Sequence, residues 1–242
     1  MAEHIATPDG RRLKKIEQRA TTATSDSSDK AVYANAPRVC YNMPNEEFFP
    51  LMMRLRDKAV LLMGDRLAEL VRWNAADRDK VLLWFGDDSE TVRQTLNDGL
   101  TRMRGIMRGL TEKSFVKFSP EGVRAAGCLP RGKEGDAPAA ASVCKEDGTY
   151  TVFIGSEFCD KDPDEITLHG VPKDVESKLT IFIHEVSHFP AAMNAEDHFY
   201  GMMPSRVRAK ARDEFCLSNS DSIAYYVANI PNWTYRPPAW KP

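Results

Sequence analysis

Residues 181–188 read IFIHEVSH, and this stretch is the most informative part of the chain for fold and function. It contains the pattern H-E-x-x-H, with His184 and His188 four residues apart and Glu185 directly after the first histidine. Residues four apart lie on the same face of a helix, so both imidazoles can point at one metal ion. Neutral imidazole binds zinc well, and the adjacent carboxylate can take a proton from water that the metal activates. The stretch therefore predicts a zinc site on a helix.

A five-residue pattern also arises by chance, and His184 and His188 can equally be ordinary, partly buried histidines. Two features favour the metal site. The residues just before His184 are apolar, as in a helix that is buried to hold a site rigidly. An acidic segment, NAED at 194–197, follows at a distance that lets the chain turn back toward the helix.

The third metal ligand must come from outside the motif, because catalytic zinc usually has three protein ligands and one water. The longer metzincin pattern would place a glycine and a third histidine where this chain has Ala191 and Asn194. We therefore predict Asp197 as the third ligand, with Glu196 as the alternative.

Length, charge and hydropathy set outer limits. The chain has 242 residues, 42% of them hydrophobic, so it is not disordered throughout. Lys and Arg number 33 against 35 Asp and Glu, a net charge of -2, which removes the simplest argument for a nucleic-acid partner. No apolar run approaches 18 residues, so we expect no membrane-spanning helix.

The N-terminal part lacks the apolar run of a secretory signal, since residues 1–7 lead into a charged stretch. Residues 20–30 read ATTATSDSSDK, which is too polar to form a core. We expect residues 1–37 to be a disordered leader and residues 38–242 to form one catalytic domain. We also expect synthesis in the cytoplasm, with any export by a dedicated secretion system.

Hydrophobic periodicity predicts a mainly helical α+β domain. An alternating segment at 114–119 predicts a strand. The run VCKEDGTYTVFIG predicts a hairpin around a type I′ turn at Asp147-Gly148, and residues 120–141 look like loop. Helices are expected at 46–73, 76–85, 90–110, 174–189, 204–215 and 220–228. The predicted fold is a zincin-like peptidase domain with a small antiparallel sheet and an H-E-x-x-H active-site helix.

The run HEVSHFPAAMNAEDHFYG, from residue 184 on, resembles the signature of the aspzincin metallopeptidases, the deuterolysin and peptidyl-Lys metalloendopeptidase family. In that family H-E-x-x-H is followed by G-T-x-x-D and then by Tyr-Gly. The resemblance extends over about residues 40–230. It implies zinc as cofactor and a protein or peptide substrate. It further implies that His184, His188 and Asp197 are the zinc ligands and that Glu185 is the general base. Tyr200, beside Gly201, would stabilise the oxyanion.

The resemblance continues at Asn219-Ser220-Asp221-Ser222, which is similar to a downstream N-A-D segment of the family. It implies that Asp221 lies in the pocket for the residue after the scissile bond, where it would attract Lys or Arg. A second acidic residue of lysine-specific members falls on Ala224, so a broader basic preference is expected. The family Gly-Thr is replaced by Met193-Asn194, which implies a different loop shape.

Five cysteines, an odd number, leave at least one thiol unpaired or intermolecular. Secreted members of the family are stabilised by disulfides. The resemblance makes a bridge between Cys144 and Cys159 one candidate pairing. The odd count indicates a departure from those relatives.

Three hypotheses for function follow. The first is a zinc endopeptidase, with a preference for Lys or Arg after the scissile bond. The second keeps the enzyme but makes it an exported bacterial effector or toxin, acting on a protein or on peptidoglycan cross-links. The third is a zinc-stabilised, non-catalytic binding module, against which Glu185 and Tyr200 argue, because a structural site needs neither.

Overall fold

The computed structural model describes residues 37–130, 140–163 and 176–229. The expected leader at 1–37, except for its last residue, lies outside this part, as does the C-terminal segment 230–242. Within the three described ranges no helix is both long enough and apolar enough to cross a bilayer.

Helices make up most of the fold. Their bounds agree within one or two residues with the predictions for α2, α3, α4 and α9. The prediction is too long at two helices: α7 begins after its cap Ser177 and not near residue 174, and α8 ends at Lys210 and not at 215, because Arg212 has φ +56°. The two short helices α5 and α6 fall in stretches without a helical prediction. Two 3₁₀ turns, Glu112–Ser114 and Glu214–Ser218, complete the set. The α-helices are α2 (Asn45–Arg72), α3 (Ala75–Phe85), α4 (Glu90–Gly109), α5 (Pro120–Ala125), α6 (Ser156–Asp160), α7 (Lys178–Ser187), α8 (Met202–Lys210) and α9 (Ser220–Ala228).

Capping residues explain where α3 ends and α4 begins. The helix α3 ends at Gly86, which has φ +71°. A Cβ at Gly86 would lie 2.1 Å from the carbonyl oxygen of Ala209 in α8, so only glycine allows α3 and α8 this close. The Ser89 side chain then accepts a hydrogen bond from the Val92 N–H and starts α4. Both boundaries confirm the sequence prediction.

The sheet is mixed rather than antiparallel, which corrects the sequence prediction. Its strands β1 (Phe115–Lys117), β2 (Ala141–Val143) and β3 (Val152–Ile154) lie in the order β1-β3-β2. The strand β3 pairs antiparallel with β2 but parallel with β1, with Val116 opposite Phe153. Because α5 carries the chain away from the sheet after β1, that strand can lie parallel to β3.

The predicted type I′ turn is also wrong. Eight residues join β2 and β3, and Gly148 does not have the positive φ that this turn requires. Instead, the buried Asp147 carboxylate accepts hydrogen bonds from the N–H groups of Thr149 and Thr151, at 2.8 and 2.7 Å. These bonds favour a wider loop, closed by Tyr150 with φ +58°.

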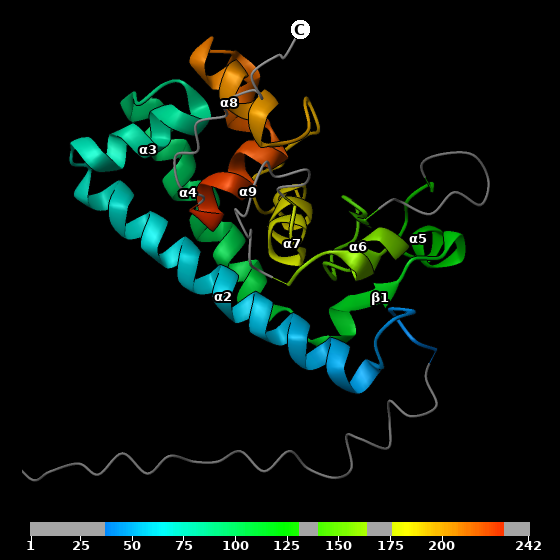
Figure 1. The fold of residues 1–242 in the computed structure, drawn as a ribbon. Helices are drawn as coiled ribbons and strands as arrows, with labels where there is room; N and C mark the ends of the chain where they lie inside the picture. Colours follow the sequence, from blue (N-terminus) through cyan, green and yellow to red (C-terminus); the bar gives the residue numbers. More distant parts are fainter. Residues whose placement is uncertain (1–36, 131–139, 164–175, 230–242) are drawn as a thin grey trace, which may run out of the picture.

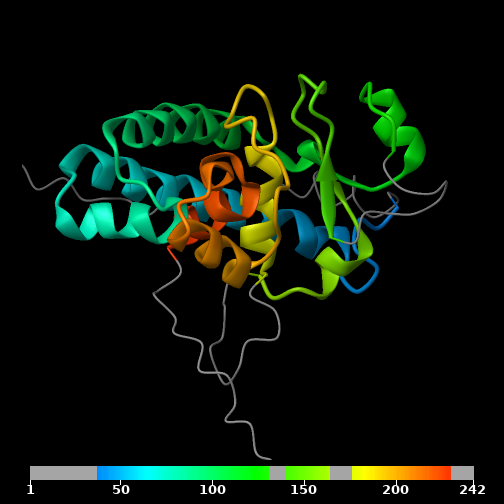
Figure 2. The same cartoon turned by 90° about the horizontal axis from the view of Figure 1, so that it is seen from above.

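The helix α7 lies at the centre of the molecule (Figure 1). The helices α3, α4, α8 and α9 lie on one side of it, the sheet with α5 and α6 lies on the other, and the long helix α2 runs past it from one side to the other, as Figure 2 shows from above. Aromatic pairs join these parts. Trp84 stacks on Tyr225 of α9, and Phe115 of β1 meets Phe182 of α7 edge-on, with ring centroids 5.4 and 5.3 Å apart. The helix α7 itself contacts α9 on one side and β2 on the other, so the core holds it from both sides.

Two disulfides, Cys40–Cys159 and Cys128–Cys144, replace the Cys144–Cys159 pairing expected from the resemblance. The first ties the segment before α2 to α6, and the second ties the end of α5 to the end of β2. Cys216 is the free thiol and is buried. The odd count therefore reflects one unpaired core cysteine and not the absence of disulfides.

Candidate metal centre and active site

The helix α7 is positioned by its N-terminal cap and its apolar faces. Ser177 and Thr180 form a reciprocal capping box at the first turn. Phe182, Ile183 and Val186 are fully buried, so the helix is fixed in rotation. His184 and Glu185 lie in its last turn and His188 is its C-cap residue. The motif thus ends a rigid helix that is buried almost throughout.

Three candidate ligand atoms converge beyond this helix end. The Nε2 atoms of His184 and His188 are 3.2 Å apart, and the Oδ1 atom of Asp197 lies 3.1 Å from the first and 3.3 Å from the second. Ligands at about 2.0–2.1 Å from one ion and at tetrahedral angles would be about 3.3–3.4 Å apart. The three atoms therefore form a triangle of the size that tetrahedral zinc requires.

The Asp197 carboxylate supports this fit independently. Its Oδ1 atom is buried and, among the described residues, has no hydrogen-bond partner apart from its contacts with the two imidazole Nε2 atoms. A buried, unpartnered carboxylate oxygen is costly unless a cation neutralises it. The residues therefore fit a zinc ion with one position left open.

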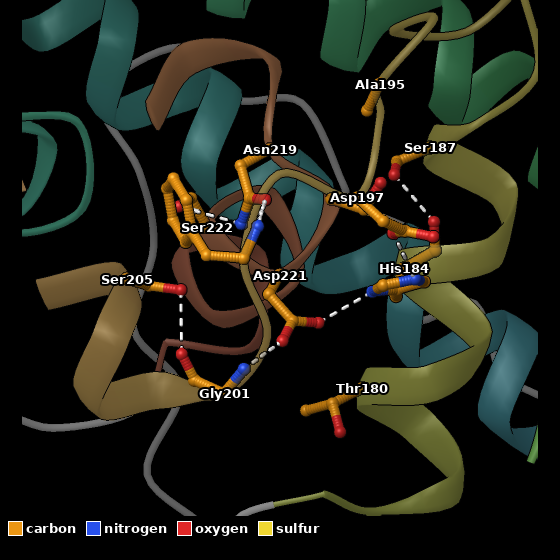
Figure 3. A network of polar contacts seen from close by, with 12 residues as sticks. Thr180, His184, Ser187, Ala195, Asp197, Gly201, Ser205, Asn219, Asp221 and Ser222 are labelled. Carbon is orange, nitrogen blue, oxygen red and sulfur yellow. Dashed lines mark hydrogen bonds and ion pairs between the residues drawn. The ribbon is translucent and has the colours of Figure 1, made fainter. Parts of the chain in front are cut away.

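Hydrogen bonds behind the two histidines orient their rings. The Nδ1 atom of His184 lies 2.6 Å from Asp221 Oδ1 (Figure 3). The Nδ1 atom of His188 lies 2.9 Å from the Ala195 carbonyl oxygen. Each oxygen is an acceptor, so it favours a proton on Nδ1 and leaves the Nε2 lone pair facing the triangle. Ser220 Oγ also lies 3.2 Å from His188 Nδ1.

The loop after α7 is held in place by main-chain bonds. The Ala195 N–H donates to Ser187 O, and Glu196 pairs with Asn219 in a β-bridge. The Asn219 side chain accepts from the N–H groups of His198 and Phe199. These bonds bring Asp197 to the end of α7.

Two residues of this loop can be compared with the predictions made from the sequence. Asn194, at the altered Gly-Thr position, has φ +51°, a conformation that asparagine tolerates better than most residues. The Glu196 carboxylate forms an ion pair with Lys145 at 2.5 Å. The alternative ligand Glu196 therefore lies outside the triangle, while Asp197 lies within it.

Glu185 and Tyr200 lie beside the triangle. Glu185 is 7% exposed, and burial raises the pKa of its carboxyl group. Tyr200 is 63% exposed, and its ring stacks with the His184 ring at 6.4 Å between centroids. Burial of its hydroxyl, together with the nearby charge of Asp197, raises the pKa of Tyr200 to about 12, so the hydroxyl is a donor at neutral pH.

The carboxylates around His184 control its protonation in the metal-free protein. Burial alone would lower the pKa of His184, but contact with Asp197 and Asp221 raises it to about 10. The pKa of Asp197 is lowered, because the two histidines outweigh its burial. The proton on His184 thus occupies the place that a dication would take.

Asp221 lies deeper than the resemblance implied. It is 6% exposed, and its second oxygen accepts a hydrogen bond from the Gly201 N–H at 2.5 Å. Its two oxygens are therefore engaged with His184 and Gly201, although its charge still faces the neighbouring cavity. The sequence did not reveal the contributions of Ala195 O and Ser220, because a backbone carbonyl and a lone serine carry no motif.

Two cavities meet at the candidate site. One, of about 320 Å³, extends toward β2 and α5, and the other, of about 380 Å³, extends toward α6 and α9. Both are lined by Ala141, Glu185, Asp197 and Tyr200. The candidate ligands and the buried carboxylate thus lie where two arms of one cleft join.

This fold, with three candidate zinc ligands beside a cleft, is that of a zinc peptidase. A family model described as lysine-specific metallo-endopeptidase matches residues 71–228, and the chain belongs to this family, the aspzincins. It is therefore a hydrolase, a zinc metalloendopeptidase. Among solved structures, a zinc peptidase from Grifola frondosa is similar in fold, with a TM-score of 0.55, 18% identity, and coverage of 76% of this chain and 95% of that one. No curated protein sequence matches significantly.

Proposed function

We propose that this endopeptidase uses His184, His188 and Asp197 as zinc ligands, Glu185 as general base and Tyr200 as oxyanion donor. The observation that carries the proposal is the triangle of ligand atoms, with edges of 3.1–3.3 Å, beside a buried carboxylate. A structural zinc site would be closed by a fourth protein ligand and would need no such carboxylate.

Zinc, when bound, would polarise the scissile carbonyl and lower the pKa of water toward neutrality. Glu185 takes the proton from the attacking water and delivers it to the leaving amine, a role that its raised pKa favours. The Tyr200 hydroxyl donates a hydrogen bond to the oxyanion as charge develops. Asp221 and the Ala195 carbonyl keep the ligand rings in place.

The outer strand of the sheet supports an extended peptide as substrate. The Gly155 N–H donates to Ala140 O, and hydrogen-bonded pairs alternate along an antiparallel ladder. The main-chain groups of Ala141 and Val143 therefore face away from β3. Because β2 is at the edge of the sheet and lines the cleft, a substrate main chain can add to it as a further strand.

The preference for a basic residue after the scissile bond is part of the same proposal. The 380 Å³ cavity is lined by the carboxylates of Glu157, Glu176 and Asp221, and by no Lys or Arg among the residues that the structure describes. Glu176 forms an ion pair with Lys161, which reduces its charge. Ala224 provides no second carboxylate on α9, so we propose acceptance of both Lys and Arg.

We also propose that residues 1–37 form a leader, that residues 38–242 form the catalytic domain, and that the protein is exported as an effector. Disulfides persist in oxidising compartments, so the two disulfides support a protein that acts outside the cytoplasm. The target of the exported enzyme is tested by comparing its cleavage of a protein substrate with its cleavage of cross-linked peptidoglycan. Limited proteolysis tests the leader: cleavage confined to residues before 38, with full activity retained, would support it.

The decisive experiment is Glu185→Gln. The variant should bind zinc as the wild type does and lose cleavage of a lysine-rich protein by at least about 10²-fold, because a missing general base typically costs 10²–10⁴. Wild-type cleavage should stop with a chelator and occur beside Lys or Arg. Full activity of the variant would disprove the assignment, and zinc binding without any cleavage by wild type would favour the non-catalytic module.

A further inference from the structure

The arm of the cleft that extends from Glu185 toward β2 and α5 differs in chemistry from the arm lined by Glu157, Glu176 and Asp221, which we call the acidic arm. One side of its wall is apolar, while Lys145, Glu146 and Glu196 line another part. We refer to it as the apolar arm, after the residues of its apolar side: Phe118, Val123, Leu129, Pro130 and Val143. They come from the end of β1, from α5 and its following turn, and from β2. Residues distant in sequence thus form one apolar surface next to the catalytic group.

The apolar arm is not a part of the main core left uncovered by chance. Val123 packs with Cys144 and Phe153 in a small second cluster, separate from the main hydrophobic core. Leu129 is 85% exposed, and Phe118 is half-buried at the edge of that cluster. The fold therefore maintains a separate apolar platform whose outer side faces the cleft.

The disulfide Cys128–Cys144 holds this platform rigid. It links the residue before Leu129 to the residue after Val143, and so joins the two sides of the wall. A wall that is already ordered costs little conformational entropy when a ligand binds. The apolar arm is therefore prepared to receive a side chain rather than assembled by it.

One charged pair in this arm is satisfied within the protein. Lys145 pairs with Glu196 and donates to the Ala195 carbonyl oxygen. The exposed Glu146 carboxylate lies beside the disulfide, whose sulfur has no proton to donate, so Glu146 keeps its charge at the rim of the arm. The selective element of this arm is thus its apolar wall, in contrast to Glu157, Glu176 and Asp221 in the other arm.

We propose that the apolar arm is the subsite for a large apolar side chain, such as Leu, Phe or Met, on the amino side of the scissile bond. This inference rests on the proposed function. Because both arms meet at Glu185, Asp197 and Tyr200, an extended peptide whose basic side chain enters the acidic arm has its preceding residues at the apolar arm. The substrate class is therefore a peptide in which a large apolar residue is followed by a basic one.

The test compares peptides that differ only in the residue before Lys. The wild-type enzyme should cleave a Leu-Lys peptide with kcat/KM at least about tenfold above a Gly-Lys peptide, since even one methylene in an apolar pocket gives about 10–200-fold. Leu129→Asp should reduce this ratio to near one, and Phe118→Ala should lower it. Leu61→Asp is the matched control, because Leu61 is 67% exposed on α2 and lies outside the cleft.

A zinc dissociation constant and a melting temperature like those of wild type show that each variant is folded. Equal cleavage of Leu-Lys and Gly-Lys by wild type, or an unchanged ratio in both cleft variants, would overturn the inference alone. If wild type cleaves no peptide, the proposed function fails. The subsite is then tested by the affinity of zinc-loaded Glu185→Gln for the two peptides: tighter binding of Leu-Lys supports it and equal binding disproves it.

Discussion

Replacing Asp221 with asparagine separates its contact with His184 from its charge in the acidic arm. The carboxylate uses one oxygen on His184 Nδ1 and the other on the Gly201 N–H. Asparagine has nearly the same shape but one carbonyl oxygen, so it can accept from His184 or from Gly201 and not from both. In either orientation one buried donor loses its acceptor.

The magnitude follows from these contacts. A hydrogen bond to a charged group contributes about 1.5–3 kcal/mol, and residues that orient metal ligands typically change metal affinity about 10–100-fold. The second range corresponds to about 1.4–2.8 kcal/mol, which agrees with the first. We therefore expect Asp221→Asn to raise the zinc dissociation constant about 10–100-fold at pH 7.5.

The assay is competition with a chromophoric zinc chelator, combined with kcat/KM measured at saturating zinc. Asp65→Asn, which makes the same change on the exposed face of α2, is the control. A zinc dissociation constant within about twofold of wild type would refute the reasoning. If that constant is unchanged and only KM for basic substrates rises, Asp221 would act through its charge in the substrate pocket.

Three further predictions concern the ligand triangle and the disulfides. Asp197→Ala should abolish stoichiometric zinc, whereas Glu196→Ala should retain it; the reverse result, in metal analysis of purified protein, would exchange their roles. Zinc affinity should rise about tenfold per pH unit from pH 7 to 9, because zinc displaces the proton that His184 holds up to a pKa of about 10. Calorimetry in buffers of different ionisation enthalpy should show release of about one proton, and no release would contradict the raised pKa. Loss of the Cys40–Cys159 bridge by Cys40→Ser should destabilise the protein by about 5 kcal/mol, since the bridge closes a loop of 119 residues. Denaturant unfolding measures this, and a change below about 1 kcal/mol would show that the bridge contributes little.

Local signals in the chain were sufficient for the long helices. Their apolar spacing and caps predicted α2, α3 and α4 within one or two residues, because each signal acts within a few turns. The prediction of loop over residues 120–141 is wrong at the short helix α5, although Ser119 followed by Pro120 is a helix-start signal. Six residues are too few to show a helical period, so the surrounding glycines and prolines dominated the interpretation.

The sheet and the disulfides depended on contacts between distant segments. Asp147-Gly148 favours a tight turn by composition, but the Asp147 carboxylate collects backbone N–H groups and opens the loop. Cys159 pairs with Cys40, far away in sequence, because α6 lies against the segment before α2, where the Asn42 side chain donates to the Cys159 carbonyl oxygen. Neither spacing nor composition encodes that proximity.

By itself, the sequence predicted the zinc site of this protein: H-E-x-x-H on an apolar helix places His184 and His188 on one face, with Glu185 beside them. It also predicted Asp197 as the third ligand, with Glu196 as the alternative, and the resemblance added Tyr200. Only the tertiary structure decided that Glu196 lies outside the ligand triangle, that Asp221 bonds to His184, and that the cleft has an acidic and an apolar arm. The reason is physical: a helix repeats every few residues and can be read locally, whereas a hydrogen bond or a cavity wall forms between segments that only the packed core brings together.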